Sequence, residues 1–193
     1  METNIGKQKP VDCLKVVLFG PESTGKTTLA RRLADAYQTC FVPEFARDYL
    51  QKKWDDSNET CDLNDLLIIT NEQIKLENQY AKKANKVLFC DTNVVVTEVW
   101  SETHFDGYCH TEIKKKAAVF HYDYYFLTYI DVPWEQDDLR DRPNNRNEMF
   151  NAFQNKIETY GYPYSILKGN EQERLEKAKA IVETLLIKKK TRP

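Results

Sequence analysis

The stretch of sequence that decides the fold is Gly20-Pro21-Glu22-Ser23-Thr24-Gly25-Lys26-Thr27. It matches the pattern G-x-x-x-x-G-K-[ST], the P-loop, in full. Glycines at both ends of such a loop let the backbone fold around phosphate, because a Cβ would block the close approach. Successive N–H groups then point at the phosphate oxygens, helped by the N-terminus of the helix that follows. A strand-like run directly before the motif and a helix-like run directly after it supply the context that this loop requires.

Two side chains of the motif are predicted to act beside its backbone. Lys26 is expected to reach the β- and γ-phosphates of ATP, and the Thr27 hydroxyl is expected to coordinate Mg²⁺. ATP and Mg²⁺ are therefore the predicted cofactors. The predicted ATP-binding set adds to the eight quoted residues Thr28, Arg142 and Arg146. Glu22 is unusual in a loop that binds anions, so its side chain is expected to face solvent or a basic partner.

Strand-like and helix-like segments alternate along the rest of the chain. Apolar runs predict strands at 14–19, 39–42, 86–90, 124–130 and 164–167. Helical spacing predicts helices at 27–37, 64–84, 94–102, 111–121, 148–160 and 172–187. The segment 94–102 is ambiguous, since Val94-Val95-Val96 favours a strand, but the chain has just left one, so a helix is predicted. This alternation predicts an α/β fold, a three-layer α/β/α P-loop NTPase of the NMP-kinase-like kind with a five-stranded parallel sheet.

Size and charge limit the classes of function. A chain of 193 residues suits one domain, predicted at 14–187, with a flexible N-terminal arm at 1–13 and a basic C-terminal tail at 188–193. The net charge of −2 provides no overall attraction for nucleic acid or for an anionic membrane, so neither is an expected partner. No apolar run approaches the roughly 20 residues that span a bilayer. With a polar N-terminus and five scattered cysteines, these features predict a cytoplasmic protein.

Polar residues that follow the predicted strands are candidates for catalysis, because ligands bind at the carboxyl ends of strands in such sheets. Asp91 ends the strand 86–90 and could hold Mg²⁺ or an acceptor hydroxyl, or it could cap the next helix. Glu44 follows the strand 39–42 and could accept a proton from an attacking hydroxyl. Arg47 shares a helical face with Glu44, and the two could also form a plain surface pair.

A charged stretch at 135–146 contains Arg140, Arg142 and Arg146. Phosphoryl transfer is favoured by cations that close over the charge-bearing oxygens and exclude water. The stretch is therefore predicted to be a mobile lid, with a solvated charged loop as the alternative.

Five sequence elements occur together in an order that resembles a known family. They are Gly-Pro-Glu-Ser-Thr-Gly-Lys-Thr-Thr at 20–28, Pro-Glu-Phe-Ala-Arg at 43–47, Asp-Thr at 91–92, Pro-Trp at 133–134 with Leu-Arg at 139–140, and a helix at 150–158. The chain resembles, over roughly residues 14 to 187, the ribosylnicotinamide kinase domain of NadR-type proteins, which are P-loop kinases of NAD salvage.

The resemblance implies a reaction and a set of residues. The reaction is ATP + nicotinamide riboside → ADP + nicotinamide mononucleotide. Glu44, Arg47, Asp91 and the adjacent Thr92 are expected to face the riboside, and Arg140 is expected to belong to the lid. The family also places aromatic side chains on both sides of the nicotinamide. Pro43 precedes Glu44 here, so Phe45 or Tyr80 is expected to substitute for them.

Other functions stay open at the level of sequence. Pro43 in place of an aromatic residue makes a kinase for another nucleoside or nucleotide the first alternative. A nucleotide-dependent regulatory ATPase without a small-molecule acceptor is the second, although the guanine-reading signature NKxD is absent. Either Glu44 or Asp91 could be the base that receives the hydroxyl proton.

Overall fold

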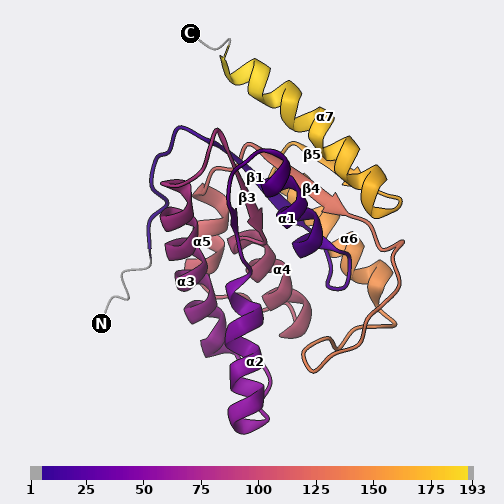
Figure 1. The fold of residues 1–193 in the computed structure, drawn as a ribbon. Helices are drawn as coiled ribbons and strands as arrows, with labels where there is room; N and C mark the ends of the chain where they lie inside the picture. The colour runs from indigo at the N-terminus through magenta and orange to yellow at the C-terminus, as the bar shows by residue number, and fades with distance from the viewer. Residues whose placement is uncertain (1–5, 191–193) are drawn as a thin grey trace.

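One central sheet organises the molecule. In the computed structural model, which describes residues 6–190, five parallel strands lie in the order β2-β3-β1-β4-β5 (Figure 1). The strands are β1 (Leu14–Phe19), β2 (Phe41–Val42), β3 (Val87–Asp91), β4 (Tyr124–Thr128) and β5 (Tyr164–Leu167). β1 pairs with β3 and with β4 and so lies at the centre. Its carboxyl end, where the P-loop begins, is therefore in the middle of the strand edge where ligands bind.

Helices cover both faces of the sheet. On one face are α1 (Lys26–Ala36) and α7 (Glu171–Lys190), and on the other are α3 (Leu63–Ala81), α4 (Val94–His104), α5 (Thr111–Val119) and α6 (Arg146–Thr159). The side chains of strand β1 explain why both faces are covered. Val17 and Phe19 belong to one apolar core, and Leu18 belongs to the core on the opposite face. A strand buried on both faces reads as a continuous apolar run, as 14–19 does.

Helix α2 (Phe45–Ser57) differs from the other helices. None of its thirteen residues is fully buried, and Figure 1 shows it projecting from the body at the end of the molecule that also carries the long connection between β4 and α6. It packs mainly along α3. Its position therefore depends on polar contacts more than on a core.

The predicted fold class is confirmed, and the bounds of several elements differ from the prediction. The segment 94–102 is helical, as α4, because Asn93 caps it by accepting a hydrogen bond from the Val96 N–H at 3.3 Å. The strand predicted at 39–42 is reduced to two residues, and the one predicted to reach residue 130 ends at Thr128. Helix α6 begins at Arg146 instead of at 148, and α7 continues to Lys190, so the first part of the predicted basic tail is helical.

Part of the predicted N-terminal arm lies against the domain. The Asn78 side chain of α3 accepts a hydrogen bond from the Lys9 N–H at 2.8 Å and donates one to the Lys7 carbonyl at 2.9 Å. Gln8 makes a similar pair of bonds with the backbone of His121. Residues 1–5 and 191–193, which belong to the predicted arm and tail, lie outside the described residues. Within residues 6–190, no helix has both the length and the apolar character needed to cross a bilayer.

Candidate active site

The P-loop has the backbone geometry that its glycines were expected to provide. Gly20 has a φ of 132°, and a Cβ at this position would lie 2.8 Å from the Thr128 hydroxyl oxygen and 3.0 Å from the Thr128 carbonyl oxygen. Gly25 has a φ of 78° at the start of α1. Side chains are strained in this region of φ, and at Gly20 there is also no room for one. The loop therefore lies directly on the end of β4.

Buried side chains hold the loop in place. The Thr24 hydroxyl, 1% exposed, hydrogen-bonds with the Thr128 hydroxyl at 2.7 Å. From the first turn of α7, the Arg174 guanidinium donates to the Thr24 carbonyl at 2.7 Å and to the Tyr129 carbonyl at 3.0 Å, and it forms an ion pair with Asp131. Because such buried groups are costly to leave unpaired, the loop is tied to the C-terminal helix as well as to β4.

Lys26 lies inside the loop. It is 9% exposed, and its Nζ donates a hydrogen bond to the Pro21 carbonyl at 2.6 Å. Lys26 and Thr28 line the central cavity, as do all the other residues of the motif except Pro21. The P-loop residues predicted to bind ATP are thus brought together around one space.

Thr27 and Asp91 form the predicted metal pair. The Thr27 hydroxyl donates to Asp91 Oδ2 at 2.5 Å. The other carboxylate oxygen, Oδ1, is buried and has no hydrogen-bond partner among the described residues. A hydroxyl and a carboxylate are oxygen ligands of the kind that Mg²⁺ prefers, and an unpartnered buried oxygen is available for it. Burial raises the pKa of Asp91, against the opposing effects of Lys26 and of the Thr27 hydroxyl. The alternative role as a helix cap falls to Asn93 instead.

Glu44 lies at the start of α2 and lines the same cavity. Burial raises the pKa of its carboxyl, and the negative charge of Asp91 raises it further. The turn that carries Glu44 is held by Gln73 of α3, whose side chain accepts from the Phe45 N–H at 2.8 Å and donates to the Pro43 carbonyl at 3.2 Å. Two carboxyl groups that influence each other beside a phosphate-binding loop are suited to proton transfer.

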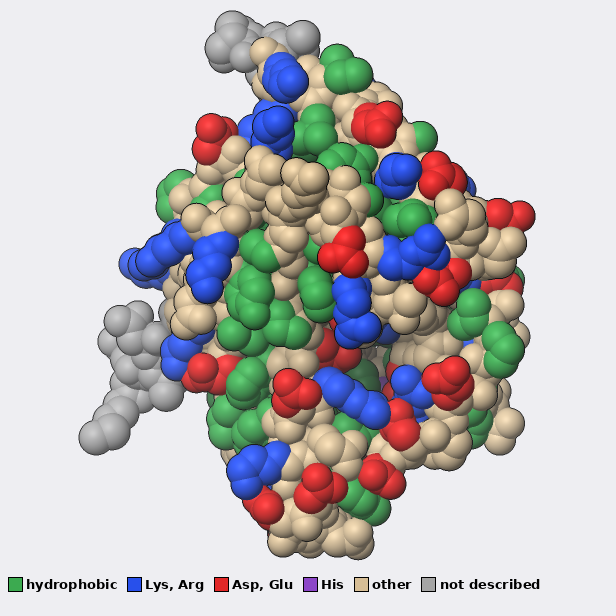
Figure 2. All heavy atoms as spheres, in the orientation of Figure 1, with side chains coloured by type: hydrophobic (Ala, Val, Ile, Leu, Met, Phe, Trp, Pro, Cys, Tyr) green, Lys and Arg blue, Asp and Glu red, His purple; other side chains and the backbone are tan. Residues whose placement is uncertain are grey.

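The cavity has a volume of about 640 Å³. Its walls include the polar groups Glu44, Arg47, Gln73, Asp91 and Thr92, and the apolar side chains Leu66, Ile69 and Trp100. Figure 2 shows acidic and basic side chains gathered around a hollow between α1 and α2. A space of this size, with apolar walls and a few convergent polar groups, is typical of a small-molecule site.

The aromatic side chains that line the cavity differ from Phe45 and Tyr80, which were expected there. Neither Phe45 nor Tyr80 lines the cavity. Phe45 stacks on Tyr49, with ring centres 5.7 Å apart, and Tyr80 lies near the C-terminal end of α3, where its ring is 5.8 Å from Lys83 Nζ. This corrects the expectation that one of them faces the acceptor. Trp100 of α4 and Phe153 of α6 line the wall instead, and the Trp100 ring stacks on His104 with ring centres 3.8 Å apart.

The predicted lid is the connection between β4 and α6. Arg140 and Arg142 line the cavity, whereas Arg146 does not. Arg146 is the first residue of α6, and its guanidinium donates to the Ser23 carbonyl at 3.2 Å and to the Val132 carbonyl at 2.9 Å. This corrects its predicted place in the ATP-binding set, because it contacts the backbone of the P-loop from outside the cavity.

Glu22 faces the cavity, with charges of both signs near its carboxylate. The carboxylate accepts a hydrogen bond from the Arg142 N–H at 3.4 Å. Burial raises the pKa of Glu22, and the hydrogen bond from Arg142 lowers it by less. The charge of Asp141 also raises this pKa, and the charges of Lys26 and Arg140 lower it. The P-loop and the connection between β4 and α6 therefore touch through side chains as well as through the loop backbone.

Three residues at the site were not found from the sequence. Gln73 and Trp100 lie inside helices, where their spacing reads as ordinary helical pattern, and Arg174 lies 150 residues from the P-loop carbonyl that it contacts. Only the tertiary structure brings them to the site.

The family model described as an AAA domain matches residues 15–174. The chain belongs to the AAA domain family. Within this AAA domain, the resemblance to NadR-type proteins is confirmed by comparison with curated proteins. The trifunctional NAD biosynthesis/regulator protein NadR of Salmonella typhimurium is 29% identical over 77% of this chain and 36% of that protein. The NadR of Escherichia coli is 29% identical over 68% of this chain and 32% of that protein. The chain thus spans about a third of the length of these relatives.

Solved structures share the fold of the AAA domain. A crystal structure of NadR protein in complex with NR has a TM-score of 0.74 at 23% identity, and it covers 89% of this chain and 51% of that chain. A deoxyadenosine kinase from M. mycoides has a TM-score of 0.63 at 12% identity over 89% of this chain and 100% of that chain. At these identities the likeness supports the fold, and function must be argued from the site.

Proposed function

We propose that this protein is an ATP-dependent kinase that phosphorylates the 5′-hydroxyl of nicotinamide riboside to give nicotinamide mononucleotide. One observation carries the proposal: the carboxylates of Glu44 and Asp91 line the same cavity as Lys26 and the P-loop. A group that can take a proton is thereby close to the loop that holds the phosphates. The similarity to NadR proteins supports nicotinamide riboside as the acceptor.

The donor half of the site holds the triphosphate. Backbone amides of the P-loop and the Lys26 ammonium contact the phosphates, and the bond from Lys26 Nζ to the Pro21 carbonyl uses only one of the three ammonium donors. Thr27 and Asp91 would hold Mg²⁺, which neutralises charge on the β- and γ-phosphates when it is bound. The loop needs little rearrangement, because Thr128 and Arg174 already fix it.

The acceptor half orients the hydroxyl. Glu44 accepts the proton of the 5′-hydroxyl as the new P–O bond forms and the bond between the γ-phosphorus and the β–γ bridging oxygen breaks, which leaves ADP. Asp91 can take this role in place of Glu44, since its pKa is raised as well. Arg140 and Arg142 of the cavity wall supply positive charge beside the transferring group.

The shape of the acceptor half favours a nucleoside. Trp100 provides a flat ring surface, and Leu66 and Ile69 provide apolar surface. The polar groups are those of Arg47, Gln73 and Thr92. A ribose and a planar ring need this combination. We place the reaction in the cytoplasm, where ATP is available and where the free thiols of the cysteines stay reduced.

A kinase for a different nucleoside or nucleotide is the second candidate. It is favoured by Pro43 beside Glu44 and by Trp100 and Phe153 in place of the expected aromatic residues. The similarity in fold to a deoxyadenosine kinase agrees with this candidate as well as with the first.

A coupled assay of ADP release, with and without nicotinamide riboside, tests the proposal. We expect release to depend on the riboside and turnover of about 1–100 per second at saturation. A panel of nucleosides and deoxynucleoside monophosphates, with labelled ATP, separates the two candidates. Transfer to one of these in preference to nicotinamide riboside would replace the first candidate by the second. Slow hydrolysis that no small molecule stimulates would instead favour a regulatory ATPase.

A further inference from the structure

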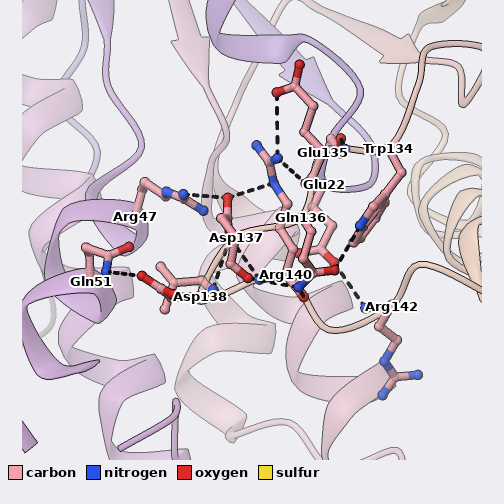
Figure 3. Close-up of polar contacts among 12 residues, drawn as sticks. Glu22, Arg47, Gln51, Trp134, Glu135, Gln136, Asp137, Asp138, Arg140 and Arg142 are labelled. Atoms are coloured by element: carbon pink, nitrogen blue, oxygen red, sulfur yellow. Dashed lines mark hydrogen bonds and ion pairs between the residues drawn. The ribbon is translucent and has the colours of Figure 1, made fainter. Parts of the chain in front are cut away.

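Asp137 occupies the centre of the connection between β4 and α6 (Figure 3). Its Oδ1 accepts hydrogen bonds from the backbone N–H groups of Leu139 at 3.0 Å and of Arg140 at 3.1 Å. An aspartate that bonds to backbone two and three residues ahead closes a local turn. The carboxylate is therefore fixed in orientation by its own loop, with Oδ2 directed elsewhere.

Oδ2 is shared by two guanidinium groups from different parts of the molecule. Arg47 of α2 donates to it through Nη2 at 2.6 Å, and Arg140 of the same connection lies with Nε 3.1 Å away. The Asp137 and Arg140 side chains are only 23% and 21% exposed. Without the carboxylate, two positive charges would face each other at partly buried positions, which is unfavourable. Among the described residues, only Arg140 would keep another ion-pair partner, Glu135 at 3.9 Å. Asp137 is thus the group that allows α2 and the connection to approach.

The same connection is attached to the P-loop on its other side. Ser23 Oγ accepts from the Glu135 N–H at 2.9 Å, and the Ser23 carbonyl accepts from Arg146 at 3.2 Å. Residues 131–146 therefore form a bridge from the donor half of the site to α2. The bridge matters for α2 because no residue of that helix is fully buried.

We propose that Asp137 is a positioning residue that couples the two halves of the site, so that nucleotide binding at the P-loop also fixes α2, with Glu44 at its start and Arg47 on it. The inference rests on the proposed function for its two ligand sites. Asp137 itself does not line the cavity. It links the two halves because one of its carboxylate oxygens holds both Arg140, assigned above to the transferring phosphoryl group, and Arg47, assigned to the acceptor.

Hydrogen exchange with mass spectrometry tests the coupling without any acceptor. The full chain is compared with and without Mg²⁺ and AMP-PNP as the non-hydrolysable ATP analogue. In the unmodified protein we expect the analogue to slow exchange in the P-loop, in 131–146, and in α2 by about fivefold. Asp137→Asn keeps the acceptor oxygen for the turn but loses the charge. In this variant we expect the analogue to slow exchange in the P-loop and to leave exchange in α2 unchanged.

Asp138→Asn is the matched control. Asp138 also contacts α2, through the neutral Gln51 at 3.0 Å, at an exposed position. We expect this variant to behave as the unmodified protein does. Protection of α2 in Asp137→Asn equal to that in the unmodified protein would overturn the inference, and so would P-loop protection that never extends to α2. Absence of any protection by the analogue, in any variant, would instead overturn the proposed function together with the inference.

Discussion

The donor half and the acceptor half of the candidate site are held in place by different kinds of contact. The donor half consists of backbone amides held by buried contacts, such as that between Thr24 and Thr128. The acceptor half consists of side chains, some of them buried, but the ion pair that holds Arg47 there is partly exposed, with 40% exposure for Arg47 and 23% for Asp137. Backbone held by a core is preformed, whereas exposed ion pairs are individually weak. The donor half is therefore rigid, and the acceptor half is the part that can adapt.

The largest expected effect comes from removing the one side-chain cation inside the P-loop. In Lys26→Ala we expect phosphoryl transfer to fall at least about 10³-fold, because the charge that contacts the β- and γ-phosphates is lost. Steady-state ADP release measures this. Lys52→Ala, which removes an exposed lysine of α2 that pairs with Asp56, is the control and should keep full activity. Retained transfer in Lys26→Ala would contradict the assigned donor half.

Glu44→Gln removes the proposed base of the acceptor half and changes no residue of the P-loop. We expect turnover to fall by about 10²-fold or more, with binding of Mg·ATP unchanged, because the group that accepts the proton is lost. Calorimetry and initial rates measure the two quantities. Glu112→Gln, at a partly exposed position on α5 where the carboxylate pairs with Lys115, is the control. Turnover near that of the unmodified protein would transfer the role of base to Asp91.

The raised pKa of Glu44 adds a pH dependence to the same comparison. A base is active when it is ionised, and burial together with the charge of Asp91 raises the pKa at which Glu44 becomes ionised. Turnover should therefore rise with pH from the acidic side, with a midpoint above the usual range of a glutamate, and the two carboxyls should titrate as a pair. In Glu44→Gln this rise should flatten.

The third effect concerns stability and tests the rigidity of the donor half. Arg174→Met leaves the carbonyls of Thr24 and Tyr129 and the Asp131 carboxylate without their buried partner. We expect a loss of about 2–4 kcal/mol in the free energy of unfolding, measured by urea denaturation, because each buried carbonyl left without its donor costs about 1–3 kcal/mol. Arg32→Met is the matched control, since Arg32 also reaches α7, through Glu171, but at the surface, and should cost about 1 kcal/mol or less. Equal losses in the two variants would show that the buried contacts of Arg174 do not hold the loop.

The sequence predicted those parts of the molecule that depend on local pattern. The strand 14–19, the P-loop and Asp91 at the end of a strand each follow from neighbouring residues, and each lies where it was expected. The failures depend on distance along the chain. Tyr80 was expected at the acceptor from the family resemblance, but three-dimensional packing places it away from the cavity, and Trp100 and Phe153 line the wall.

The predicted lid, the connection between β4 and α6, also shows that contacts between distant residues cannot be predicted from local sequence pattern. A cluster of arginines in a polar stretch indicated cations near the phosphates, and Arg140 and Arg142 do line the cavity. The pattern did not indicate that Arg146 begins a helix and contacts the loop backbone, nor that Asp137 joins Arg47 to Arg140. Such pairings join residues about 90 positions apart or more, and no periodicity in the sequence encodes them.

The hydrogen bond from Lys26 to the Pro21 carbonyl has a consequence for the entry of the nucleotide. The Lys26 ammonium carries three N–H donors, and this bond uses one of them. The other two can turn toward phosphate oxygens while the carbonyl keeps the side chain oriented. An arriving polyphosphate therefore meets a cation that is already held in place, and less side-chain conformational entropy is lost when it binds.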